Sequence, residues 1–146
     1  MEHSDNTPEV TEALEEFFAK FDPPRDPEFW AKLILEESVE VAEAFANLLK
    51  EVCDLLYVVE GFTLAGGDIL KDGEIPYPGA VLGALRVVNR EFDRDAILEM
   101  FRMVHQSNMS KLGPDGKPVR REDGKILKGP NYKAPDMLGF LERHYS

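Results

Sequence analysis

Apolar residues recur three or four positions apart along most of the chain, a spacing that predicts α-helices. The first predicted helix covers residues 7–21, where Thr7 can cap the helix and Pro8 suits its first turn. A second is expected to begin near Asp26 and Pro27, and a third to cover residues 48–64. The stripe of the first helix consists of Val10, Leu14, Phe17, Phe18 and Phe21.

Residues 65–80 are rich in Gly, Pro and Asp and are predicted to form a loop. Two more helices are predicted over residues 81–92 and 93–111, and a helical turn over residues 136–145. Between them, two Asp-Gly pairs suggest tight turns and a small hairpin. With no internal repeat and no long strand pattern, the chain is predicted to be an all-α bundle of four to five helices in a single domain, residues 1–146.

Length and composition limit the classes of protein to consider. A chain of 146 residues with 43% hydrophobic residues can bury a sizeable core and is not a disordered acidic chain. No apolar run approaches the ~18 residues of a membrane span, and the N-terminus lacks the features of a signal peptide. The single cysteine, Cys53, lies in an apolar run and reads as a small buried hydrophobe. We therefore expect a cytoplasmic protein without a membrane partner.

The charge is unevenly distributed along the chain. The formal net charge is −11, which argues against binding to nucleic acid. Residues 1–110 have a balance of −14, whereas residues 111–133 have a balance of +4. An acidic body is thus followed by a basic segment, which is either a solvated loop or a site for an anion.

Six carboxylates interrupt the apolar stretch of residues 33–59, and one of them, Glu43, points away from its apolar face. On a helical projection, Glu37 lies near the middle of an apolar face, with Glu40 at its edge and Glu36 just beyond. Glu51 and Asp54 share one flank of the following helix. A buried, unpaired carboxylate costs several kcal/mol, so Glu37 would need a proton, a cation or a metal ion. The alternative is that these residues are solvated acids beside the core.

Two carboxylate pairs with three-residue spacing suit hard cations such as Mg²⁺ or Mn²⁺. A di-iron carboxylate bundle would instead need Glu-x-x-His pairs. None of the histidines, which are His3, His105 and His144, has a Glu three residues before it. The spacing therefore favours a magnesium or manganese site over a di-iron site.

The sequence EESVE followed by EVCD resembles the ExxE…ExxD signature of the MazG-like all-α NTP pyrophosphohydrolases, a superfamily that includes phosphoribosyl-ATP pyrophosphohydrolases and dimeric dUTPases. The likeness extends to LLYVV and to SNMSK…DGK…KGPNYKAPD. It covers roughly residues 27–64 and 94–137. It is specific for the superfamily and only suggestive for the subgroup that contains the dUTPases.

The resemblance implies a MazG-like helical bundle in which acidic residues hold Mg²⁺, with Mn²⁺ as an alternative, against a nucleoside triphosphate. Glu37 and Glu40 match the ExxE pair, and Glu51 and Asp54 match ExxD. Glu37 or the adjoining Glu36 could orient and deprotonate the attacking water. Candidates for contact with the phosphates are Lys111, Lys125, Lys128 and Lys133, and candidates for contact with base or sugar are Asn108, Asn131 and Tyr132.

The implied reaction converts a (d)NTP and water into the monophosphate and pyrophosphate, in the service of nucleotide-pool sanitation. One alternative is hydrolysis of phosphoribosyl-ATP, and another is a non-catalytic regulator that binds nucleotides through the same helices. The resemblance also implies a homodimer or homotetramer. An apolar surface around most of the helix predicted over residues 48–64 points the same way.

The interval between the two acidic elements is short. On one straight helix, Glu40 and Glu51 would stand ~16 Å apart at 1.5 Å per residue, too far to bind one ion. The sequence therefore requires either a tight reversal near Ala46 and Asn47 or a site that a second subunit completes. Residues 66–93 look like an insertion relative to compact members, and could cover the site, pack on a partner chain, or do neither.

Overall fold

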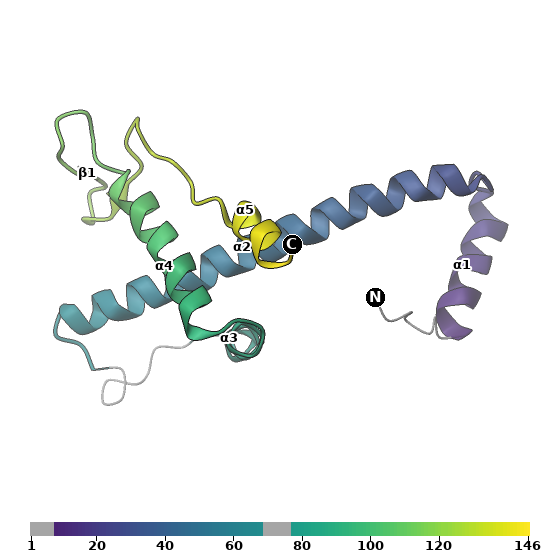
Figure 1. The fold of residues 1–146 in the computed structure, drawn as a ribbon, viewed down its shortest axis with the longest axis horizontal. Helices are drawn as coiled ribbons and strands as arrows, with labels where there is room; N and C mark the ends of the chain where they lie inside the picture. The colour runs from purple at the N-terminus through teal and green to yellow at the C-terminus, as the bar shows by residue number, and fades with distance from the viewer. Residues whose placement is uncertain (1–7, 69–76) are drawn as a thin grey trace. The chain divides into compact units, whose positions relative to one another are not determined.

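The computed structural model describes residues 8–68 and 77–146, and the predicted cap Thr7 lies outside them. Within these ranges the chain forms five helices and one antiparallel sheet of two short strands, which confirms the predicted all-α bundle (Figure 1). The elements are α1 (Pro8–Phe21), α2 (Pro27–Leu64), α3 (Ala80–Glu91), α4 (Arg94–Met109), β1 (Val119–Arg120), β2 (Ile126–Leu127) and α5 (Met137–His144).

Helix α2 is a single helix, so the predicted division into two helices with a reversal near Ala46 and Asn47 is wrong. No Gly or Pro follows Pro27 until Gly61, and the intervening Ala, Leu, Glu and Lys residues favour helix. Ala46 and Leu49 are both buried, so the apolar stripe runs straight through the expected turn. The helix ends just before Gly66, whose positive φ of 94° suits a helix C-terminus.

Two compact units divide the chain, one up to Val39 and one from Glu40. In the first unit, α1 is joined to the start of α2 by residues 22–26. The ring of Phe18 stacks on Trp30 with centroids 5.3 Å apart, and the indole N–H of Trp30 donates to the carbonyl of Pro24 at 2.8 Å. None of the described residues of this unit is buried. Its apolar stripe therefore remains accessible in the single chain.

The second unit contains the hydrophobic core. The rest of α2 supplies four buried residues, which meet buried residues from α3, α4 and α5 in one cluster. Figure 1 shows α4 and α5 lying against this part of α2. The cluster consists of Ala46, Leu49, Val52, Cys53, Val88, Phe92, Met100, Val104, Met137, Phe140 and Leu141. Val88 and Phe92 belong to the segment that looked inserted, so the described part of that segment packs into the core.

Aspartates cap the starts of two helices in the second unit. Asp93 caps α4 by accepting a hydrogen bond from the backbone N–H of Ala96 at 2.8 Å, and Asp136 caps α5. The predicted hairpin is present: Val119 pairs with Leu127 and Arg120 with Ile126. Among the described residues, no helix is both long and apolar enough to cross a membrane.

Cys53 is part of the core, as expected for a small buried hydrophobe. Burial raises the pKa of its thiol to about 11, and the nearby charge of Asp54 adds to the shift. The thiol is therefore protonated near neutral pH, which makes it a poor nucleophile and metal ligand.

Two methionines of α4 provide a matched test of this core. Met100 is 1% exposed and Met109 is 55% exposed. We expect Met100→Ala to lower the free energy of unfolding by about 2–5 kcal/mol, because it leaves a cavity. Met109→Ala should lower it by less than about 1 kcal/mol. Urea unfolding followed by circular dichroism measures both values, and equal losses would contradict the assignment of the core.

Candidate functional site

The predicted carboxylates all lie on α2 and differ in accessibility. Glu36, Glu37, Glu40 and Glu51 are exposed, whereas Asp54 is half-buried. Glu36 and Glu37 belong to the first unit, and the other three belong to the second. Within the described part of the chain, Glu37 and Glu40 form no ion pair or hydrogen bond through their side chains, so both are free to bind a cation.

The expectation that Glu37 sits on a buried face does not hold for the single chain. Its apolar neighbours Ile34 and Val41 are 67% and 68% exposed, so this face is itself open to solvent. A solvated carboxylate needs no partner to remain charged.

Asp54 has a partner that the sequence reasoning missed. The ammonium group of Lys50 lies 2.8 Å from Oδ2 of Asp54 and 3.5 Å from Oε1 of Glu51. The hydrogen bond with Asp54 raises the pKa of Lys50 above its ordinary value. The two acids that match ExxD thus already hold a cationic group. The four-residue interval between Lys50 and Asp54 is the signal that could have predicted this contact.

Within the second unit, Glu40 and Glu51 are far apart along α2. Glu40 and Glu51 lie on the same continuous helix, so ~16 Å separates their backbones along its axis at 1.5 Å per residue. Across residues 8–68 and 77–146, no group of three or more His, Cys, Asp or Glu residues is placed to hold a metal ion. The predicted metal site therefore stays a prediction.

The basic segment has a defined structure. The backbone N–H of Gly129 donates to the carbonyl of Lys111 at 2.9 Å, which closes the segment at its base. A side chain at position 129 would not fit, since a Cβ atom there would lie 2.6 Å from the carbonyl oxygens of Lys111 and Leu112. Lys125 lies in the turn of the hairpin, where its carbonyl accepts from the backbone N–H of Arg121 at 2.8 Å. The segment is thus an ordered loop.

Ser107 of α4 and Ser110, which caps the C-terminus of that helix, attach the end of this segment to α4. The hydroxyl of the buried Ser107 donates to the carbonyl of Lys133 at 2.7 Å. The hydroxyl of Ser110 accepts from the backbone N–H of Lys133 at 2.9 Å. Both polar groups of the Lys133 backbone are therefore held, although nothing in the sequence pattern marks the two serines for this role.

An open cavity of about 650 Å³ lies where the basic segment meets the end of α4. Three of the predicted substrate contacts line it, namely Asn131, Tyr132 and Lys133. The ammonium group of Lys128 lies 4.7 Å from the centre of the Tyr132 ring. The cavity is lined by Met109, Ser110, Leu112, Gly113, Pro130, Asn131, Tyr132 and Lys133. The structure thus groups part of the predicted substrate set, while Asn108, Lys111 and Lys125 lie outside this lining.

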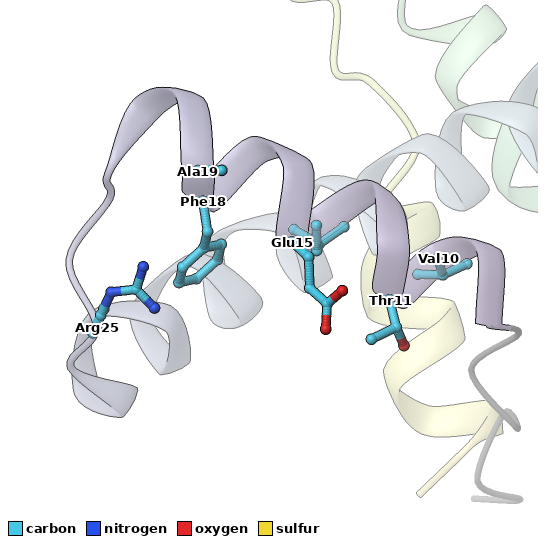
Figure 2. Close-up of a pocket in the computed structure, with 7 residues that line it drawn as sticks. Val10, Thr11, Glu15, Phe18, Ala19 and Arg25 are labelled. Atoms are coloured by element: carbon cyan, nitrogen blue, oxygen red, sulfur yellow. The ribbon is translucent and has the colours of Figure 1, made fainter.

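A second hollow, of about 470 Å³, lies in the first unit (Figure 2). Figure 2 shows the side chains of Phe18 and Arg25 next to each other, and the guanidinium carbon lies 5.1 Å from the ring centre. The lining residues are Val10, Thr11, Leu14, Glu15, Phe18, Ala19 and Arg25. The lining includes none of the predicted site residues, so this hollow adds nothing to the acidic site.

No protein-family model and no curated protein sequence matches the chain. Among solved structures, it is similar to a candidate NTP pyrophosphohydrolase from Exiguobacterium sp. 255-15. The identity is 21%, the match covers 94% of this chain and 96% of the other, and the TM-score is 0.31. At that TM-score the similarity supports no statement about the activity of this chain.

The serine anchors can be tested with a matched pair of variants. We expect Ser107→Ala to lower the free energy of unfolding by about 0.5–1.5 kcal/mol, because the part-buried hydrogen bond from its hydroxyl to the carbonyl of Lys133 is lost. It should also speed amide exchange at Lys133 and tryptic cleavage after that residue. Ser38→Ala is the control, since its hydroxyl donates only to the carbonyl of Ile34 in its own helix. Unchanged exchange at Lys133 would contradict the anchoring role.

Proposed function

We propose that the chain is a Mg²⁺-dependent nucleoside triphosphate pyrophosphohydrolase, which converts a (d)NTP and water into the monophosphate and pyrophosphate. The proposal rests first on the resemblance of its two acidic elements to the ExxE…ExxD signature. The structural observation that most supports it is the accessibility of these acids. Within the described residues, Glu37 and Glu40 are exposed and unpaired, rather than committed to a structural ion pair. We place its role in cytoplasmic nucleotide-pool sanitation.

The chemistry of the donors fits a hard divalent cation. All four candidate ligands, Glu37, Glu40, Glu51 and Asp54, offer carboxylate oxygens, which Mg²⁺ and Mn²⁺ prefer. One of the pairs already attracts the ammonium group of Lys50. When bound, the metal would neutralise the triphosphate and stabilise charge on the attacking and leaving oxygens. Glu37 or Glu36 would accept the proton of the attacking water.

The basic segment would bind the other end of the substrate. Lys111, Lys125, Lys128 and Lys133 would neutralise phosphate oxygens, and Asn108, Asn131 and Tyr132 would contact base or sugar. The cavity beside Tyr132 and Lys133 supports this assignment, because it offers an aromatic ring and an amide next to a cation. A substrate panel that includes dNTPs, NTPs and phosphoribosyl-ATP would define the preferred nucleotide.

We further propose that the active form is a homodimer or homotetramer. One chain separates the two acidic pairs along α2, so acids from a second copy would have to complete the site. The same helix leaves Ile34, Leu35, Val41 and Val58 exposed. Covering these residues with another copy would remove a large apolar surface from water, at about 25 cal/mol for each Å² buried.

The acidic site can be tested by removing one charge at a time. We expect Glu37→Gln and Asp54→Asn to abolish Mg²⁺-dependent pyrophosphate release from dNTPs, because each removes a predicted metal ligand. Glu60→Gln is the matched control, since Glu60 is also exposed on α2 but lies outside the signature. Its rate should stay within about twofold of wild type. Melting temperatures would show that the variants fold, and full activity in both site variants would refute the assignment.

The assembly makes a separate prediction. Light scattering at micromolar concentration should show a species of at least twice the 16.5 kDa chain mass. Val58→Asp, at a position 63% exposed in the single chain, should shift this species towards monomer and reduce pyrophosphate release with it. The physical reason is that an interface would bury this carboxylate without a partner. A stable and fully active monomer would contradict the proposal.

A further inference from the structure

The cationic group that Asp54 and Glu51 hold is half-buried, unlike a typical surface lysine. The side chains of Lys50 and Asp54 are 32% and 34% exposed, and that of Glu51 is 61% exposed. Lys50 is flanked in sequence by the buried residue Leu49 and lies near Val52 and Cys53, which also belong to the core. Solvent screens a partly buried ion pair less than a surface pair. The ammonium group of Lys50 is thus held against Asp54 at the border of the core.

A second ion pair on α2 differs from the Lys50–Asp54 pair in the order of its acid and base. Glu28 and Lys32 also lie four residues apart, with 3.6 Å between their charged groups, and their side chains are 76% and 72% exposed. That pair has the acid on the N-terminal side, which is the favourable order in a helix. Lys50 and Asp54 have the reverse order, which contributes less to helix stability. Helix stability alone is thus a poor reason for a lysine at position 50.

We propose that Lys50 is a built-in competitor of the divalent cation: in the metal-free protein its ammonium group occupies the cation position beside Asp54 and Glu51, and Mg²⁺ must displace it. This inference rests on the proposed function, because it takes these two acids as metal ligands. Lys50 would then set the metal concentration at which the site fills. It would also protect the metal-free chain from repulsion among its acidic residues.

A cavity beside Lys50 could receive the displaced ammonium group. Lys50 borders a cavity of about 230 Å³ on the side of α2 that faces the start of α5. Two carboxylates, those of Glu43 and Asp136, line the same cavity. The remaining lining residues are Ala46, Asn47, Pro135, Met137 and Leu138. Glu43 and Asp136 are thus the acids of this cavity that a displaced ammonium group would approach, and Asp136 also caps α5.

Mn²⁺ binding without nucleotide tests this competition directly. Titration of the full chain, followed by calorimetry and by the electron paramagnetic resonance signal of free Mn²⁺, measures affinity independently of turnover. We expect Lys50→Gln to bind Mn²⁺ roughly three- to tenfold more tightly than wild type, because the metal no longer displaces a cation. It should also lower the melting temperature of the metal-free protein, and Mn²⁺ should restore the loss.

Three further variants separate the outcomes. Lys50→Arg keeps the charge and should bind Mn²⁺ like wild type, and Lys32→Gln removes a charge elsewhere on α2 and should also leave the affinity unchanged. Equal affinity in wild type and Lys50→Gln, with binding still lost in Asp54→Asn, would overturn the competition but leave the proposed function intact. Mn²⁺ binding that Asp54→Asn does not weaken would instead refute the metal site, and the role of Lys50 with it.

Discussion

The burial of one stripe of α2 is the constraint on which the second unit depends. Leu49 stands at its centre and is almost completely removed from water by residues of α3, α4 and α5. Burying one leucine contributes roughly 1.5–3 kcal/mol, and ten further residues share the cluster. Because the stripe fixes the rotation of α2 about its axis, it also fixes which way the neighbouring acids point. Asp54 is half-buried for that reason, since it directly follows Cys53 of the core.

The spacing of apolar residues was sufficient to predict the helices but not the continuity of α2. The helical spacing of apolar residues continues on both sides of Ala46 and Asn47. The neighbouring residues favour helix, so the sequence contains no signal that ends the helix there. The reversal was one of two ways to bring the acidic pairs together, the other being a second subunit. The unbroken helix rules out the reversal, and completion of the site by a second copy stays a proposal. The hairpin was predictable because its turns depend on local Asp-Gly pairs.

For the candidate site too, some features follow from the local sequence and others depend on tertiary contacts. The identities of the acids and the basic character of residues 111–133 follow from the sequence. The anchoring of Lys133 does not, because Ser107 lies 26 positions away and looks like any other polar residue of a helix. The burial of Glu37 was predicted wrongly for a related reason: a helical projection identifies an apolar face but not what covers it. In the described part of the chain, Ile34 and Val41 on that face are exposed.

Closure of the basic segment at Lys111 and Gly129 allows the sequence of the loop to vary independently of the core. Everything between these residues leaves and returns at almost the same point, so its length can change with little effect on the distance between α4 and α5. Lys117, Arg120 and Lys125 lie within this stretch and are exposed. Insertions and substitutions there could retune the charge presented to a ligand while the core stays intact. Gly129 is the exception, because any side chain at that position would force the base of the loop open.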